Sequence, residues 1–150
     1  MKNFIGVVVF AAASAASAGP LPPPPPYVSA ATKTIMSLPP ESDAYRNLFA
    51  SDLTVEENGV LIGQGVDKWI SMQSGCAHKP NVLGYSSGWK GDLGTLLIID
   101  TFDSVRRDNL PATMIADPRP VTRSTFYQFG ADEKIHRINV SSVMSFWRKP

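Results

Sequence analysis

The sequence predicts an α+β domain whose curved β-sheet closes over a small pocket. Helical patterns come first along the chain and a run of strand patterns follows them, which is the order typical of this class. Residues 48–59 indicate a helix end that runs into a strand finishing on the carboxylate of Glu57. Residues 125–138 indicate a hairpin with alternating apolar side chains. Together these stretches predict that Glu57 lies at the wall of the pocket.

The N-terminus has the features of a cleaved signal peptide, predicted at residues 1–18. Lys2 gives a positive start, residues 4–13 are apolar but too short to span a bilayer, and residues 16–18 are small. We therefore expect an exported protein, periplasmic or secreted, without stable membrane insertion after cleavage. Residues 19–26 form a proline-rich linker that favours an extended polyproline helix. We interpret it as a stiff spacer, with a docking peptide as the alternative.

The remaining residues, 27–150, make one ordinary domain. Its first part is predicted to hold three helices and a short hairpin. Two prolines stop the first helix, acidic residues suit the start of the second, and an Asn-Gly pair marks the hairpin turn. The helices are expected at residues 27–38, 41–50 and 66–73, and the hairpin strands at 53–57 and 60–62.

The second part of the domain is predicted to be a series of strands. Both sides of the strand beginning at Leu96 are apolar, so we expect both to be covered. Its second side, with Leu97 and Ile99, can meet a helix or another subunit. A connection as long as residues 104–120 is usually functional or mobile. The strands are expected at residues 81–90, 96–103, 120–129 and 134–146.

Charge and cysteine content exclude several classes of function. The 14 basic residues become 13 once Lys2 is removed and then match the 13 acidic ones, so no basic surface for nucleic acid is expected. Cys76 is the single cysteine and only two histidines are present, so neither an intrachain disulfide nor a zinc site is expected. Residues 84–88 match the G-x-S-x-G pattern of serine hydrolases, but the following residues predict another strand where that motif needs a helix. We interpret the match as chance.

The chain resembles the nuclear transport factor 2-like superfamily, which includes ketosteroid isomerases, scytalone dehydratases and SnoaL-like polyketide cyclases. The resemblance rests on residues 48–57, the Gly63-x-Gly65 entry into the helix of Trp69, and the final hairpin. It runs from about residue 41 to about residue 146. It implies a cone-shaped domain, with helices packed into a strongly bent mixed or antiparallel sheet around an apolar cavity. No cofactor is expected.

The resemblance also implies roles for particular residues. The isomerases have a strand of the form Leu-Phe-Ala-Asp-Asp-Ala-Thr-Val-Glu-Asp whose last carboxylate is the general base, and Glu57 takes that place here. A carboxylate in an apolar cavity gains proton affinity, which suits a base. The aspartic acid that donates to the oxyanion in the isomerases falls on Thr125, which is not an acid. Thr125 can still donate one hydrogen bond, and Tyr127, predicted on the same face of the strand, can supply a second donor. We therefore do not predict steroid isomerisation for this chain.

Other residues are expected to line the pocket. Asp100 either joins Glu57 there or forms a salt bridge with Arg123 or Arg137, which we prefer. His136 is predicted to share a face with Ile138 and Val140, as a proton exchanger or as a hydrogen-bonded core or rim histidine. The predicted ligand contacts are Trp69, Asp100, Phe102, Arg123, His136, Ile138 and Val140.

Three hypotheses for function follow. The first is binding of a small apolar or aromatic molecule, with Glu57, Thr125 and Tyr127 as polar contacts. The second is a cofactor-free isomerase, dehydratase or cyclase in which Glu57 moves a proton and Tyr127 or Thr125 steadies the oxyanion. The third is a non-catalytic homodimer or partner-binding module that uses the outer sheet face at Leu97 and Ile99.

Overall fold

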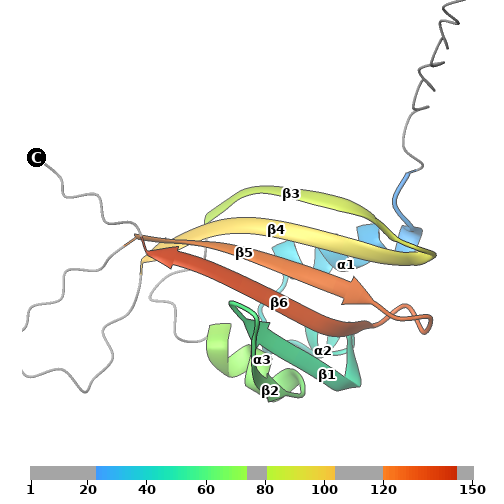
Figure 1. Ribbon diagram of the computed structural model, residues 1–150. Helices are drawn as coiled ribbons and strands as arrows, with labels where there is room; N and C mark the ends of the chain where they lie inside the picture. The colour runs from blue at the N-terminus through green and yellow to red at the C-terminus, as the bar shows by residue number, and fades with distance from the viewer. Residues whose placement is uncertain (1–22, 74–80, 104–119, 145–150) are drawn as a thin grey trace, which may run out of the picture.

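The computed structural model describes residues 23–73, 81–103 and 120–144 (Figure 1). The predicted signal peptide, Cys76 and the connection from residue 104 to residue 119 lie outside these residues. The elements, in chain order, are α1 (Pro26–Ser37), α2 (Asp43–Arg46), β1 (Phe49–Glu57), β2 (Val60–Gln64), α3 (Val66–Gln73), β3 (Asn81–Lys90), β4 (Leu93–Asp103), β5 (Pro120–Phe129) and β6 (Ile135–Met144).

The strands form one six-stranded sheet in the order β2-β1-β6-β5-β4-β3. Neighbouring strands are antiparallel except β1 and β6, which run parallel. The sheet is strongly curved and open, and the three helices lie on one side of it (Figure 1). The α+β class is therefore confirmed. We call the side of the sheet that faces the helices the inner face and the opposite side the outer face.

The inner face carries most of the hydrophobic core. Alternate residues of a strand point to the same face, so antiparallel and parallel partners in register form rows across the sheet. Trp69 of α3, which is fully buried, belongs to the same core. One row contains Leu96, Tyr127, Ile138 and Val55, and the next contains Ile98, Thr125, Val140 and Glu57.

The element boundaries agree with the prediction to within about two residues, except in the second helix and at the starts of β1 and β4, which begin four and three residues earlier than predicted. That helix is predicted to reach residue 50, but α2 ends at Arg46 and β1 begins at Phe49. The prediction is wrong here because Phe49 pairs with Ile135 of β6 and is buried as a strand residue. Ser42 caps α2 by accepting a hydrogen bond from the Tyr45 amide at 3.3 Å.

The turn between β1 and β2 follows directly from its sequence. Asn58 and Gly59 have φ values of 49° and 81°, which only a few residue types adopt at low cost. The turn brings β2 back as the edge strand beside β1. It also ends β1 at Glu57, which fixes the position of that carboxylate on the inner face.

On the outer face, Leu97 and Ile99 are half-buried beside Phe126, the register partner of Leu97. These residues form a small apolar area in the middle of an otherwise more polar face. Whether a second copy covers this area stays a prediction.

Candidate functional site

The central strand β5 places three polar side chains in the core. Arg123, Thr125 and Tyr127 alternate along the strand and therefore share the inner face. They are 7%, 1% and 3% exposed. Burial of a polar group is costly unless it is hydrogen-bonded, so each needs a partner or a reason for lacking one.

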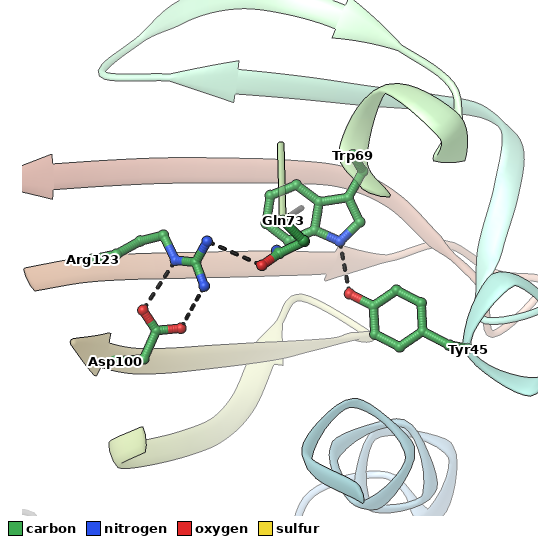
Figure 2. Close-up of polar contacts among 5 residues, drawn as sticks. All are labelled: Tyr45, Trp69, Gln73, Asp100 and Arg123. Atoms are coloured by element: carbon green, nitrogen blue, oxygen red, sulfur yellow. Dashed lines mark hydrogen bonds and ion pairs between the residues drawn. The ribbon is translucent and has the colours of Figure 1, made fainter. Parts of the chain in front are cut away.

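Arg123 finds its main partner on the adjacent strand (Figure 2). Its Nε and Nη2 atoms donate to the two carboxylate oxygens of Asp100 at 3.0 and 2.7 Å. Nη1 donates to Oε1 of Gln73 at the end of α3, at 3.1 Å. The guanidinium also lies 5.0 Å from the ring centre of Phe102. The preferred expectation for Asp100, a salt bridge with Arg123, is confirmed.

Trp69 and two tyrosines form an aromatic group beside this ion pair. Trp69 Nε1 donates to the Tyr45 hydroxyl at 2.9 Å (Figure 2), and its ring lies edge-on to Tyr127 with centroids 6.1 Å apart. Burial raises the pKa of Tyr45 to about 12. Burial likewise raises the pKa of Tyr127 well above its usual value. Both phenols therefore stay protonated near neutral pH and can act as hydrogen-bond donors.

The hydroxyls of Thr125 and Tyr127 differ from the other buried polar groups. Within residues 23–73, 81–103 and 120–144, no side-chain hydrogen bond reaches either hydroxyl. In the same ranges every fully enclosed polar side-chain atom does have a partner. The small accessible surface that Thr125 and Tyr127 retain must therefore include their hydroxyl oxygens. Thr125 and Tyr127 thus present two hydroxyls on the inner face that no side chain in these ranges engages.

Glu57 lies on the same face as these hydroxyls, at the end of β1. It is partly buried and accepts a hydrogen bond from Ser142 Oγ at 3.2 Å. Val140 pairs with Glu57 on one side and with Thr125 on the other, so the three side chains belong to one row. At a strand spacing of about 4.8 Å, the backbones of Glu57 and Thr125 are roughly 10 Å apart.

The expected position of His136 is wrong. Phe129 pairs with Ile135 and Tyr127 pairs with Ile138, so β6 contains one extra residue at this point. This bulge turns Ile135 into the core and leaves the His136 side chain 36% exposed.

His136 instead bridges two surface carboxylates. Its Nδ1 and Nε2 atoms lie 2.8 Å from Asp52 Oδ1 and 2.8 Å from Asp132 Oδ1. The hydrogen bond to Asp132 is the main cause that raises the pKa of His136, and the charge of Asp52 adds to it. The bond to His136 in turn lowers the pKa of Asp132. Glu133 and Lys134, in the same turn, are the other charged groups nearby along the chain.

The remaining predicted contacts belong to the inner face. Trp69, Ile138 and Val140 are buried in the core, and Phe102 is half-buried against Arg123. No ligand contact of theirs is tested, so their binding roles stay predictions.

Sequence reasoning missed three polar partners. Arg123 is hydrogen-bonded to Gln73 and Trp69 to Tyr45. Glu57 is hydrogen-bonded to Ser142. A signal existed for Gln73, which follows Trp69 by four residues and so lies on the same side of the helix. The G-x-S-x-G match lies wholly within β3, which turns back into β4. The structure therefore supports the interpretation of that match as chance.

Comparisons with known proteins extend this picture. No family model matches the chain, and no curated protein matches its sequence. Solved structures do match. A protein from Catenulispora acidiphila with a ketosteroid isomerase-like fold, solved in complex with trimethylamine, is 19% identical with a TM-score of 0.50, covering 79% of this chain and 85% of its own. A candidate polyketide cyclase from Pseudomonas putida KT2440 is 13% identical with a TM-score of 0.53, covering 80% and 90%.

The chain has the nuclear transport factor 2-like fold. A candidate polyketide cyclase from Silicibacter sp. TM1040 agrees, with 13% identity, a TM-score of 0.53 and coverage of 80% of this chain and 87% of its own. The nuclear transport factor 2-like fold explains the curved mixed sheet with helices on one face. Identities this low establish the fold, and the activity has to be argued from the side chains. No helix among the described residues is long and apolar enough to cross a membrane.

We expect Arg123→Met to lower the free energy of unfolding by about 3–5 kcal/mol, because it leaves the Asp100 carboxylate buried without its counter-charge. Urea denaturation measures the change. Arg137→Met is the matched control, since Arg137 is 46% exposed in its pair with Glu56, and should cost less than about 1 kcal/mol. Equal small losses in the two variants would contradict the assignment of Arg123 as the central buried charge.

We expect the stability contributed by His136 to depend on pH. The pKa of His136 is raised in the folded chain, so its contribution is complete below 6.5, the pKa in the unfolded chain. The contribution is lost as pH rises through the pKa in the folded chain. The pKa of Asp132 is lowered in the folded chain, so its contribution to stability is complete above 3.8, the pKa in the unfolded chain. That contribution is lost as pH falls through the pKa in the folded chain. His136→Gln should therefore destabilise most between these limits. The check is an NMR titration of His136, in which Asp132→Asn should lower the pKa. A His136 pKa at or below 6.5 in the unmodified chain would contradict this assignment.

Proposed function

We propose that this chain is an exported protein that binds one small apolar or aromatic molecule on the inner face of its sheet. The polar group of that molecule accepts hydrogen bonds from Thr125 and Tyr127. The observation that supports the proposal is that two inner-face residues, Thr125 and Tyr127, which are 1% and 3% exposed, have hydroxyls that no side-chain hydrogen bond among the described residues reaches. A hydrogen bond from each hydroxyl to a ligand contributes about 0.5–1.5 kcal/mol.

The neighbours of these hydroxyls support an apolar ligand. Ile98 and Val140 flank Thr125 in its row, and Leu96 and Ile138 flank Tyr127. All four are buried in the core. Aromatic faces such as that of Trp69 favour stacked or edge-on contact with a flat molecule. The surroundings therefore favour a ligand that is largely hydrocarbon.

The charges near the hydroxyls support an uncharged ligand. Both oxygens of Asp100 are bonded by Arg123, so this pair is already compensated. The donors that remain, Thr125 and Tyr127, are neutral hydroxyls, which match a carbonyl or ether oxygen better than a full charge.

Export is supported by the N-terminal sequence. Residues 1–18 have the positive start, the short apolar run and the small-residue cleavage pattern of a signal peptide. The compartment, periplasmic or extracellular, follows from the source organism.

A second candidate function is cofactor-free isomerisation, dehydration or cyclisation. The observation that favours it is Glu57, whose carboxylate faces inward, with Ser142 bonded to one oxygen. In this reaction Glu57 takes a proton from a carbon beside a ligand carbonyl, and the C–H electron pair forms a carbon–carbon double bond. The carbonyl oxygen gains the negative charge, which the protonated Tyr127 stabilises before the proton returns. The two similar structures of candidate polyketide cyclases support this class by analogy.

We expect native mass spectrometry of the protein purified from its own source to retain one small molecule. Tyr127→Phe and Thr125→Val should each weaken binding of that molecule about five- to tenfold, because each removes one hydrogen bond. Tyr85→Phe is the matched control, since Tyr85 is 58% exposed, and should leave binding unchanged. Unchanged affinity in both Tyr127→Phe and Thr125→Val would contradict the binding proposal.

We expect Glu57→Gln to separate binding from catalysis. The amide keeps the size and a hydrogen-bond acceptor of Glu57 but cannot take up a proton, so affinity should stay while turnover of the bound molecule falls by about a hundredfold or more. Glu56→Gln, one residue away on the outer face, is the control and should leave both unchanged. Equal turnover in Glu57→Gln and the unmodified chain would remove Glu57 from the mechanism and leave a binding protein.

A further inference from the structure

The tip of the β3–β4 hairpin exposes an unusual amount of aromatic and aliphatic surface. β3 is an edge strand of the sheet, and Trp89 near its end is 44% exposed. Leu93, the first residue of β4, is 39% exposed on the opposite face of the hairpin. Trp89 pairs with Gly94, whose missing side chain faces α1. Trp89 therefore lies on the helix side of the sheet, next to the point where the chain enters α1. An exposed tryptophan beside a free edge indicates a contact surface.

The residues that reach this surface are prolines. The indole Nε1 of Trp89 donates to the carbonyl oxygen of Pro23 at 3.3 Å. Pro25 is buried and has φ −55° and ψ 144°, the dihedral angles of polyproline II. Pro24 between them is half-buried. We call Pro23, Pro24 and Pro25 the proline segment.

The chemistry of this contact suits the two partners. A polyproline II helix makes no internal hydrogen bonds, and its prolines have no amide donors, so its carbonyl oxygens are free to accept. An indole offers one donor beside a broad apolar surface, which packs against pyrrolidine rings. Aromatic grooves that bind proline-rich peptides use the same combination.

A second contact holds the segment in place. The Gly94 amide donates to the Tyr27 hydroxyl at 2.8 Å, which fixes the first turn of α1 to the start of β4. A side chain at Gly94 would collide with Val28 and Tyr27, so only glycine permits this approach. Pro25 accepts hydrogen bonds from the Val28 amide at 3.0 Å and the Ser29 amide at 3.3 Å, so the segment continues directly into the helix.

We propose that Trp89 and the β3–β4 hairpin tip form a binding surface for polyproline II, and that the chain's own proline segment occupies it. The proline run continues upstream in the sequence with Pro20 and Pro22. Because the segment is covalently tethered, its effective concentration is high and it excludes free proline-rich peptides. This proposal is independent of ligand binding on the inner face.

The test uses the full chain and the indole N–H signals of its three tryptophans in NMR spectra. Trp89→Phe identifies the Trp89 signal. In a Pro23→Gly, Pro24→Gly variant, which keeps both carbonyls but loses the polyproline conformation, hydrogen exchange at the Trp89 indole should rise about fivefold. The Trp69 indole, bonded to Tyr45, should be unchanged.

Two further measurements complete the test. A Pro39→Gly, Pro40→Gly variant makes the same change in the connection between α1 and α2 and should leave exchange at Trp89 unaltered. A synthetic oligoproline peptide should then shift the Trp89 signal in the Pro23→Gly, Pro24→Gly variant and not in the unmodified chain. Unchanged exchange at Trp89 in the Pro23→Gly, Pro24→Gly variant, or no response of that variant to the peptide, would overturn the proposal.

Discussion

Arg123 and Asp100 form a buried ion pair, and the rest of the inner face is arranged around it. Two hydrogen bonds join the guanidinium to both carboxylate oxygens, and the side chains are only 8% and 6% exposed. Removing two charges from water costs several kcal/mol for each ion, and only this geometry offsets that cost. The pair forms because β4 and β5 align Asp100 with Arg123 in register. The same pairing of β4 with β5 sets Ile98 beside Thr125 and Leu96 beside Tyr127.

The same arginine ties the helix layer to the sheet. Gln73 accepts from Arg123 at the end of α3, and Trp69, one turn earlier, packs edge-on against Tyr127. A hydrogen bond therefore links the ion pair to the end of α3, and α3 in turn packs Trp69 against β5. Along the inner face of that strand the chemistry changes from a compensated charge at Arg123, to donor hydroxyls at Thr125 and Tyr127, to the apolar ring of Phe129. Among the described residues, this order places neutral donors between an ion pair and an apolar ring.

Much of the fold could be predicted because strand alternation and helix spacing are local signals. Residues 66–73 and 81–90 form the predicted helix and strand, and the inner-face position of Thr125 and Tyr127 follows from their spacing of two. Alternation gives the face of a residue but not its cross-strand partner. The choice between Arg123 and Arg137 for Asp100 therefore needed the register of the sheet.

The two local errors have the same cause. The segment after Tyr45 has apolar spacing that fits a helix, and only pairing with the distant β6 makes Phe49 a strand residue. His136 lies beside a bulge that adds one residue to β6 and reverses the expected faces of Ile135 and His136. Such pairings with distant strands cannot be predicted from the residues that are adjacent in sequence. The polar partners of Glu57 and Trp69 were missed for a similar reason, since Ser142 and Tyr45 are far from them in sequence.

The parallel pairing of β1 with β6 also governs how the domain can assemble. Thr54 donates to the His136 carbonyl 82 positions further along the chain, and without β6 the β1–β2 hairpin would have no other strand beside it. A lone two-stranded hairpin is only marginally stable in water. A ribosome must therefore release β6 before Glu57 acquires its final surroundings, because Val140 and Ser142 of that strand are its partners. Pairing of strands so distant in sequence favours slow folding.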